Sequence, residues 1–172
     1  MKPAVSPPIQ AVWNKDAIAT VVLHSGGGGG YGGIADDGWP ASANYLIRSA
    51  KLFAGHPFKV VMVGRASDVN ELDRRTRTGD KHDQDNQAVL AVIKAKSAAP
   101  VWLVGTSMGS ISVAAAAIRD GGCNIAGIVP TSSVTAYRIP GAVPAQDLEK
   151  IACRCWWCTM NAMPATPARP GR

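Results

Sequence analysis

The sequence predicts an α/β fold with three layers, in which helices cover both faces of a mainly parallel sheet. Short apolar runs alternate along the chain with segments of helical periodicity, and strands joined through helices in this way lie parallel to one another. The chain has 172 residues, of which 47% are hydrophobic and 17% are charged. This length and composition are enough for one folded domain with a sizeable core.

Four short apolar runs are the predicted strands, because apolar residues without alternation are typical of strands buried on both faces. In chain order they cover residues 18–24, 59–64, 101–105 and 125–133. Helical periodicity marks the segments between them, which are residues 41–55, 85–96 and 110–120. The predicted buried face of the first helix consists of Tyr45, Leu46, Ser49, Leu52 and Phe53.

The formal net charge is +6, but its distribution does not favour a nucleic-acid partner. Half of the excess comes from Arg154, Arg169 and Arg172, since residues 153–172 contain no acidic residue. The densest basic cluster elsewhere is DRRTR at residues 73–77, and no nucleic-acid recognition motif accompanies it. We therefore predict that the chain binds no nucleic acid.

Membrane attachment is not predicted either. No apolar run reaches the length that spans a bilayer, and the first residues, MKPAVSPPIQAVW, lack the continuous apolar core of a signal peptide. The sequence therefore predicts a cytoplasmic protein without a membrane partner, and it leaves the oligomeric state open.

The segment Gly105-Thr106-Ser107-Met108-Gly109 fits the pattern G-x-S-x-G and lies between a predicted strand and a predicted helix. A serine on such a turn has a strained backbone that holds its hydroxyl above the sheet edge. The small residues Gly105 and Gly109 let strand and helix pass close to it, and the helix N-terminus favours a developing negative charge. The pattern predicts a catalytic nucleophile at Ser107; the alternative is a small-residue turn without a catalytic role.

A glycine-rich loop, LHSGGGGGYGG at residues 23–33, follows the first predicted strand. In serine hydrolases with this kind of turn, the oxyanion hole takes one N–H group from the residue after the nucleophile and another from an early loop. Met108 is the first of these donors here, and Gly26 and Gly27 are the candidates for the second.

Other interpretations of the glycine loop involve phosphate groups. A phosphate-binding loop of the Walker type is excluded, because no lysine follows the glycines in the required pattern. A dinucleotide fingerprint fits Gly27, Gly29 and Gly32, and Arg65 stands where an acid is usual, which would suit the 2′-phosphate of NADP. An NADP-binding α/β protein and a merely flexible loop are therefore the alternatives.

With these residues the chain resembles the alpha/beta-hydrolase superfamily. The resemblance covers roughly residues 10–151 and rests on the glycine loop together with NYLIRSA (44–50), GRASD (64–68), VWLVGTSMGS (101–110) and IVPTSSVT (128–135). It implies a serine hydrolase that acts on an ester or a related small acyl substrate, with no cofactor and no metal. Ser107 matches the nucleophile of the family.

The rest of the family's catalytic triad is absent. The resemblance implies a carboxylate and then a histidine after the nucleophile. No histidine follows Ser107, and the three that precede it are His24, His56 and His82. His24 lies at the end of the first predicted strand, beside the glycine loop, and is interpreted as a residue that shapes the entrance rather than as a base. The later acids do not follow a predicted strand; they are Asp120, Asp147 and Glu149.

The stretch CRCWWC at residues 153–158 has an unusual composition. Together with Cys123, its three cysteines are candidate zinc ligands, but C-x-C-x-x-C is not a common zinc spacing, and no metal site is predicted. Reading the possible codons one base earlier allows V-P-V-L-V-V-H-H-E-R-D-A-C. That is a buried strand followed by an acid-bearing loop, similar to the strand that delivers the orienting acid in these hydrolases.

The triad fails and the composition changes at the same place, which predicts a frameshift near residue 152. Residues 1–152 are then a partial hydrolase domain, and residues 153–172 are an unstructured tail read out of frame. The expected consequence is a truncated, nearly inactive hydrolase, in effect a non-catalytic fragment.

Overall fold

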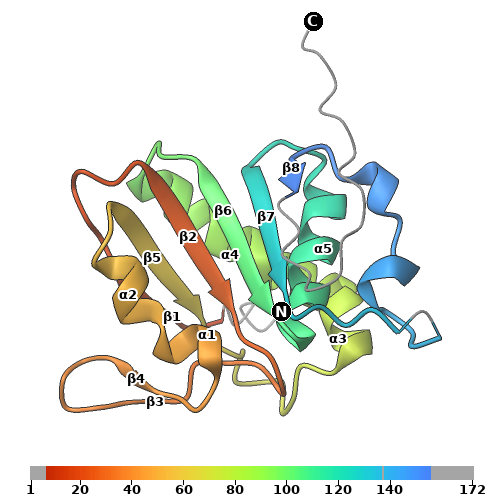
Figure 1. Ribbon diagram of the computed structural model, residues 1–172, viewed down its shortest axis with the longest axis horizontal. Coiled ribbons are helices and arrows are strands. Elements are labelled where there is room, and N and C mark those ends of the chain that lie inside the picture. Colours follow the sequence, from red (N-terminus) through yellow and green to blue (C-terminus); the bar gives the residue numbers. More distant parts are fainter. Residues whose placement is uncertain (1–6, 137, 156–172) are drawn as a thin grey trace, which may run out of the picture.

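A computed structural model describes residues 7–136 and 138–155 of the chain. Its main sheet has six strands in the order β1-β5-β2-β6-β7-β8, of which β1 is antiparallel to β5 and the others are parallel (Figure 1). The strands are β1 (Ile9–Val12), β2 (Ala19–His24), β5 (Phe58–Val63), β6 (Val101–Thr106), β7 (Ile125–Thr131) and β8 (Arg154–Cys155). A separate hairpin consists of β3 (Gly33–Ile34) and β4 (Pro40–Ala41).

Helices lie on both faces of the main sheet, with α1 and α2 on one side and α4 on the other (Figure 1). They are α1 (Tyr45–Arg48), α2 (Ala50–Ala54), α3 (Arg74–Thr78), α4 (Asp80–Lys96) and α5 (Met108–Asp120). Two 3₁₀ turns follow β7, η1 (Val143–Ala145) and η2 (Leu148–Lys150). The predicted three-layer α/β/α architecture with a mainly parallel sheet is therefore confirmed.

The core follows from the alternation of side chains along β2. Successive residues of a strand point to opposite faces of the sheet. Leu23 packs with Leu46 of α1 on one face. Val22 packs with Ile93 of α4 and Val113 of α5 on the other face. Burial on both faces explains why this strand is apolar except for Thr20 and His24.

The buried face predicted for residues 41–55 is wrong for two residues. The segment forms two short helices, α1 and α2, which meet at Ser49. Leu46 and Ile47 are buried, whereas Tyr45 and Leu52 are 64% and 71% exposed. The buried residues Leu46, Ile47 and Ala50 keep helical spacing across Ser49, so the face that packs on the sheet is turned by about one residue from the predicted one.

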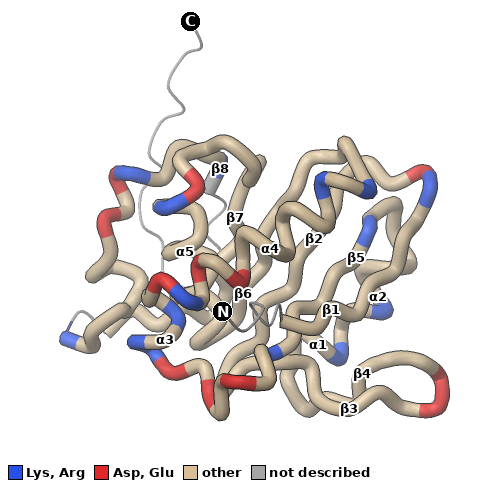
Figure 2. Tube along the Cα trace, turned by 180° about the vertical axis from the view of Figure 1, so that it is seen from behind, with Lys and Arg blue, Asp and Glu red and all other residues tan. Residues whose placement is uncertain are grey.

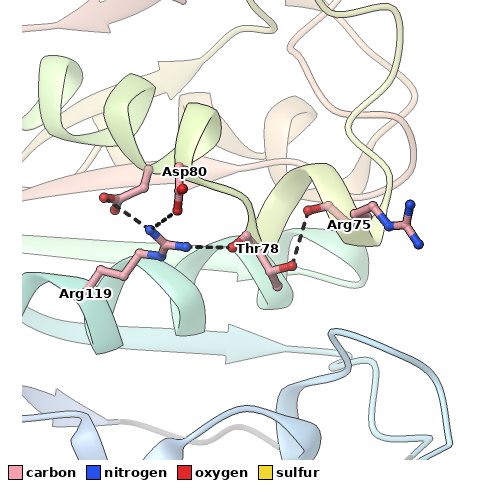
Figure 3. A network of polar contacts seen from close by, with 5 residues as sticks. Arg75, Thr78, Asp80 and Arg119 are labelled. Carbon is pink, nitrogen blue, oxygen red and sulfur yellow. Dashed lines mark hydrogen bonds and ion pairs between the residues drawn. The ribbon is translucent and has the colours of Figure 1, made fainter.

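A polar network at one end of the molecule holds α3 and α4 against α5 (Figure 3). The guanidinium group of Arg119, near the end of α5, donates a hydrogen bond of 2.8 Å to the carboxylate of Asp80. It donates another, of 2.9 Å, to the backbone carbonyl of Thr78 at the end of α3. The short helix α3, which was not predicted, is thereby fixed at its C-terminal end.

Charged residues of both signs are scattered around the described part of the chain (Figure 2). Lysines and arginines do not gather on one face, which agrees with the sequence distribution. Among the described residues, no helix is both long and apolar enough to cross a bilayer.

Candidate active site

Ser107 lies on the turn that connects β6 to α5, as the sequence predicts. Its backbone has φ 51° and ψ −122°, and its side chain is exposed. A positive φ is unfavourable for a residue with a Cβ atom and costs on the order of 1–3 kcal/mol. The surrounding structure therefore has to hold Ser107 in this conformation.

Two sets of hydrogen bonds do so. The N–H group of Ser107 donates to the carbonyl of Thr131 in β7, at 3.0 Å. The carbonyl of Ser107 accepts bonds from both the N–H and the hydroxyl group of Ser110, at 2.9 and 2.6 Å. The Ser110 hydroxyl oxygen accepts in turn from the N–H group of Val134, at 3.2 Å. The strained turn is thus tied to α5 and to the segment after β7.

The glycines on either side of Ser107 are required by backbone contacts. A Cβ atom on Gly105 would lie closer than 3.0 Å to the carbonyl oxygen of Gly109. A Cβ atom on Gly109 would lie closer than 3.0 Å to the carbonyl oxygens of His24 and Ser25. Helix α5 therefore passes β6 and β2 at a distance that only glycine allows.

The glycine loop meets Ser107 because β2 and β6 are neighbours in the sheet and His24 pairs with Gly105. A Cβ atom on Gly26 would lie 3.1 Å from the Cβ atom of Ser107. Gly27 has a φ of 58°, and its Cβ position is open. Met108 is the first residue of α5, so its N–H group has no intrahelical partner. Gly26 thus lies against the side chain of Ser107, and Met108 directly follows the serine at the start of α5.

None of the histidines forms a hydrogen bond with Ser107 in the described part of the chain. His56 is exposed on the turn before β5. Burial lowers the pKa of His24 to about 3, and the neighbouring His82 and Arg77 act in the same direction. Burial lowers the pKa of His82 to about 4, with Arg77 and Lys81 as further causes.

The acids that follow Ser107 have structural partners. Asp120 is 6% exposed, and its carboxylate accepts hydrogen bonds from the N–H groups of Asn124 and Ile125. It therefore shapes the turn between α5 and β7. Asp147 is exposed and pairs with Lys150 at 2.6 Å. Glu149 is exposed in η2.

The cysteine cluster extends beyond the described residues. Cys123 is exposed, Cys153 is half-buried, and Cys158 lies outside the described residues. In the part of the chain that the structure describes, no group of three or more His, Cys, Asp and Glu residues could hold a metal ion. Arg154 and Cys155 lie beside β7 as β8, and the remainder of the predicted tail, residues 156–172, is outside the described residues.

Arg77 belongs to the site but was missed by the sequence analysis. It is part of the basic cluster DRRTR, yet its side chain is only 2% exposed. Its guanidinium group contacts the glycine loop, more than forty residues earlier in the chain. Nothing in the local sequence distinguishes it from Arg75, which is exposed two residues earlier.

Comparisons with known proteins give structural matches only. No family model matches the chain, and no match was found among curated proteins. An alpha-beta serine hydrolase homologue from Coxiella burnetii is similar to it, with a TM-score of 0.58 and 16% identity over 87% of this chain and 65% of that one. An α/β serine hydrolase without a lid from Xanthomonas campestris has a TM-score of 0.54 and 12% identity, over 87% and 62% of the two chains.

A putative alpha/beta hydrolase from Agrobacterium tumefaciens is similar as well, with a TM-score of 0.52 and 15% identity over 88% of this chain and 62% of that one. The chain thus spans less than two thirds of the length of these solved structures. Identities this low establish the fold rather than the activity. The order of the strands, the turn at Ser107 and these likenesses together show that the chain has the alpha/beta-hydrolase fold.

Proposed function

We propose that this chain carries the nucleophile and the oxyanion hole of a serine hydrolase that acts on an ester or a related small acyl substrate. The observation that carries the proposal is the backbone of Ser107, held at a φ of 51° with an exposed hydroxyl at the start of a helix. Strain of this kind is retained mainly where it serves a function. The likeness to proteins described as serine hydrolases supports the same reaction class.

The roles follow from the positions. The oxygen of Ser107 attacks the carbonyl carbon of the substrate while its proton passes to solvent water, since no histidine base is in place in the described part of the chain. The C=O π bond opens to give a tetrahedral oxyanion, which collapses to the acyl-serine ester as the leaving group departs. Two N–H groups stabilise that oxyanion, one from Met108 and one from the glycine loop, at Gly26 or Gly27. Gly26 is favoured because it lies beside Ser107. The positive end of the α5 dipole acts on the same charge.

The site has no general base in place for Ser107 among the described residues. Among the described residues, the buried histidines His24 and His82 form no hydrogen bond with Ser107, and no histidine follows Ser107 in the sequence. Loss of triad members with a surviving oxyanion hole costs about 10⁴–10⁶ in rate. We therefore propose that this chain is a nearly inactive form of the enzyme. We also propose that it is a cytoplasmic protein.

A dinucleotide-binding function has less support. The dinucleotide fingerprint requires that the glycine turn lead directly into a helix, whose N-terminus holds the pyrophosphate. Here the loop leads into the hairpin of β3 and β4, and the first helix begins only at Tyr45. The geometry thus favours the hydrolase over the NADP-binding alternative.

A cysteine in place of Ser107 tests the nucleophile and the oxyanion hole without needing a base. A thiol ionises near neutral pH, and a helix N-terminus increases its ionised fraction. For each thiol of the Ser107→Cys variant, the rate of acetylation by p-nitrophenyl acetate is divided by the rate of alkylation by iodoacetamide. We expect this ratio to be at least about tenfold higher at the introduced thiol than at Cys123. Acetylation passes through an oxyanion, whereas alkylation does not. Mass spectrometry of the peptides measures both rates at both thiols.

Cys123 is a matched internal control, because it is exposed and lies at the opposite end of α5. The expected result is a high ratio of acetylation to alkylation at the introduced thiol alone. Equal ratios at the introduced thiol and at Cys123 would contradict an oxyanion hole beside Ser107, and with it the proposed function.

The proposed frameshift has a separate test, which is sequencing of the coding DNA across codons 145 to 172 followed by translation in all frames. We expect a one-base shift near codon 152 to open a longer frame that encodes an aspartate and a later histidine. If the DNA is confirmed and no such frame continues, the cysteine-rich stretch is part of the protein and the frameshift is refuted.

A further inference from the structure

We propose that Arg77 is a positioning residue that orients the glycine loop so that the N–H group of Gly26 faces the reacting oxygen. The inference rests on the proposed function, because it assigns a role to a residue behind the oxyanion hole. The hydrogen-bond partners of Arg77 are in the glycine loop, α5 and the segment before α3, so Arg77 acts through the loop.

The guanidinium group of Arg77 is buried, with hydrogen bonds in three directions. Nη2 donates to the carbonyl oxygens of Ser25 and Gly27, at 3.3 and 2.9 Å. Nη1 donates to the hydroxyl oxygen of Ser112 in α5, at 2.8 Å. Nε donates to the carbonyl oxygen of Leu72, at 2.8 Å. Arg77 thus connects the glycine loop to α5 and to the segment before α3.

The two loop carbonyls lie on either side of Gly26, and this determines where its N–H group points. In a trans peptide the carbonyl and the N–H group point in opposite directions, and no described peptide is cis. Because the carbonyl of Ser25 is directed at Arg77, the N–H group of Gly26 in the same peptide is directed away from it. Gly26 lies against Ser107, so this orientation leaves the donor available on the side of the reaction.

Leu72 holds the same loop from a second point. Its N–H group donates to the carbonyl of Gly28 at 2.9 Å, while its own carbonyl accepts from Arg77. A Cβ atom on Gly29 would lie 2.6 Å from the side chain of Leu72, so the loop and this segment are in tight contact. Arg119 fixes the other end of α3, as Figure 3 shows. The helix that carries Arg77 is therefore anchored on both sides.

An arginine at this buried position indicates a specific role, because removing a guanidinium group from water costs free energy. The cost is large unless its donors are satisfied, and an apolar side chain of similar size would avoid it. Only the planar, multidentate fork of arginine can bind the loop carbonyls, Leu72 and Ser112 together. A charged donor also polarises the peptides it binds, which strengthens their N–H groups as donors. Loop orientation is a function that justifies this cost.

The test uses the Ser107→Cys protein as the parent and compares Arg77→Lys with Arg75→Lys. Arg75 lies on the same helix with its side chain exposed, and only its backbone carbonyl takes part in the network of Figure 3. We expect Arg77→Lys to slow acetylation of the introduced thiol by about 5- to 50-fold, which is part of the loss caused by removing one oxyanion donor. Alkylation by iodoacetamide should stay within about twofold, since it has no oxyanion to stabilise. Arg75→Lys should change neither rate.

A purely structural role for Arg77 would lower both rates together or neither, and either result overturns the proposal. If Arg77→Lys does not fold, Ser112→Ala replaces it. That variant removes one anchor of the guanidinium group and should lower acetylation of the introduced thiol by about 2- to 5-fold without changing alkylation. A parent without preferential acetylation at position 107 refutes the proposed function, and the role of Arg77 with it. A parent with that preference and an unaffected Arg77 variant refutes the role of Arg77 alone.

Discussion

Replacing Gly109 with alanine is expected to lower the free energy of unfolding by about 3 kcal/mol or more. The added Cβ atom would lie closer than 3.0 Å to the carbonyl oxygens of His24 and Ser25. These are backbone atoms at the end of the central strand, so they cannot turn aside as a flexible side chain can. Helix α5 would have to move away from β2, and the turn at Ser107 would lose its support.

Urea unfolding of Gly109→Ala and of Gly33→Ala measures this effect under the same conditions. Gly33 is an exposed glycine with no heavy atom within 4 Å of its Cβ position, and its φ is not positive. Its replacement should change the free energy of unfolding by less than about 1 kcal/mol. A Gly109→Ala protein as stable as Gly33→Ala would show that α5 and β2 are not in close contact.

The free energy of unfolding is expected to decrease as the pH falls below about 6.5, where carboxylates are still ionised. The pKa of His24 is lowered by burial to about 3 and that of His82 to about 4, from an ordinary value of 6.5. The unfolded chain therefore binds protons that the folded chain excludes once the pH falls below about 6.5. Stability should be complete above this pH and should fall steadily down to about pH 4, by roughly 1.4 kcal/mol per pH unit for each histidine.

Positive groups near this pair add to the effect of burial, which is the main cause of the two low pKa values. The two rings have centroids 6.4 Å apart, and the ring of His82 is within hydrogen-bond distance of the Ser112 hydroxyl, at 3.0 Å. Arg77 and Lys81 add positive charge nearby.

Urea unfolding between pH 7.5 and 4.5 measures this slope. A His24→Gln, His82→Gln protein should show a much flatter dependence, whatever its absolute stability, whereas His56→Gln should keep the slope because His56 is exposed. The low pKa values of the exposed carboxyl groups of Asp37 and Asp73 act at more acidic pH, below the window of the histidines. An unchanged slope in the double variant would show that other groups cause the acid sensitivity.

The sequence predicts the layers of this fold well, because the information is local. Apolar runs such as residues 18–24 fit only a strand that is buried on both faces, and β2 occupies nearly the same residues. The edge strand β1 was missed, since its four residues are half-buried and follow no clear pattern. The face of residues 41–55 was wrong for Tyr45 and Leu52, because periodicity allows neighbouring stripes of the same helix and the contact with the sheet selects Leu46, Ile47 and Ala50.

The same distinction holds for the site. The sequence predicts the turn around Ser107 because its serine and glycines are close together in the chain, and the geometry that they impose is local. It does not predict the position of Arg77. Its partners, Ser25 and Gly27, are 52 and 50 residues earlier, and only the assembled sheet brings them together. A basic residue in a short polar segment is otherwise interpreted as part of a solvated surface.

The turn at Ser107 also has a place in the order of folding. The N–H group of Ser107 is bonded to Thr131, which lies later in the chain. The neighbouring Gly109 packs against His24, which lies much further away, near the start of the chain. Contacts between residues so distant in sequence form late, after the loops between them have closed. When β6 and α5 have formed without β2 and β7, the contacts that stabilise the positive φ of this serine are missing. We therefore expect Ser107, the proposed nucleophile, to take up its strained conformation only after β2, β6 and β7 have paired.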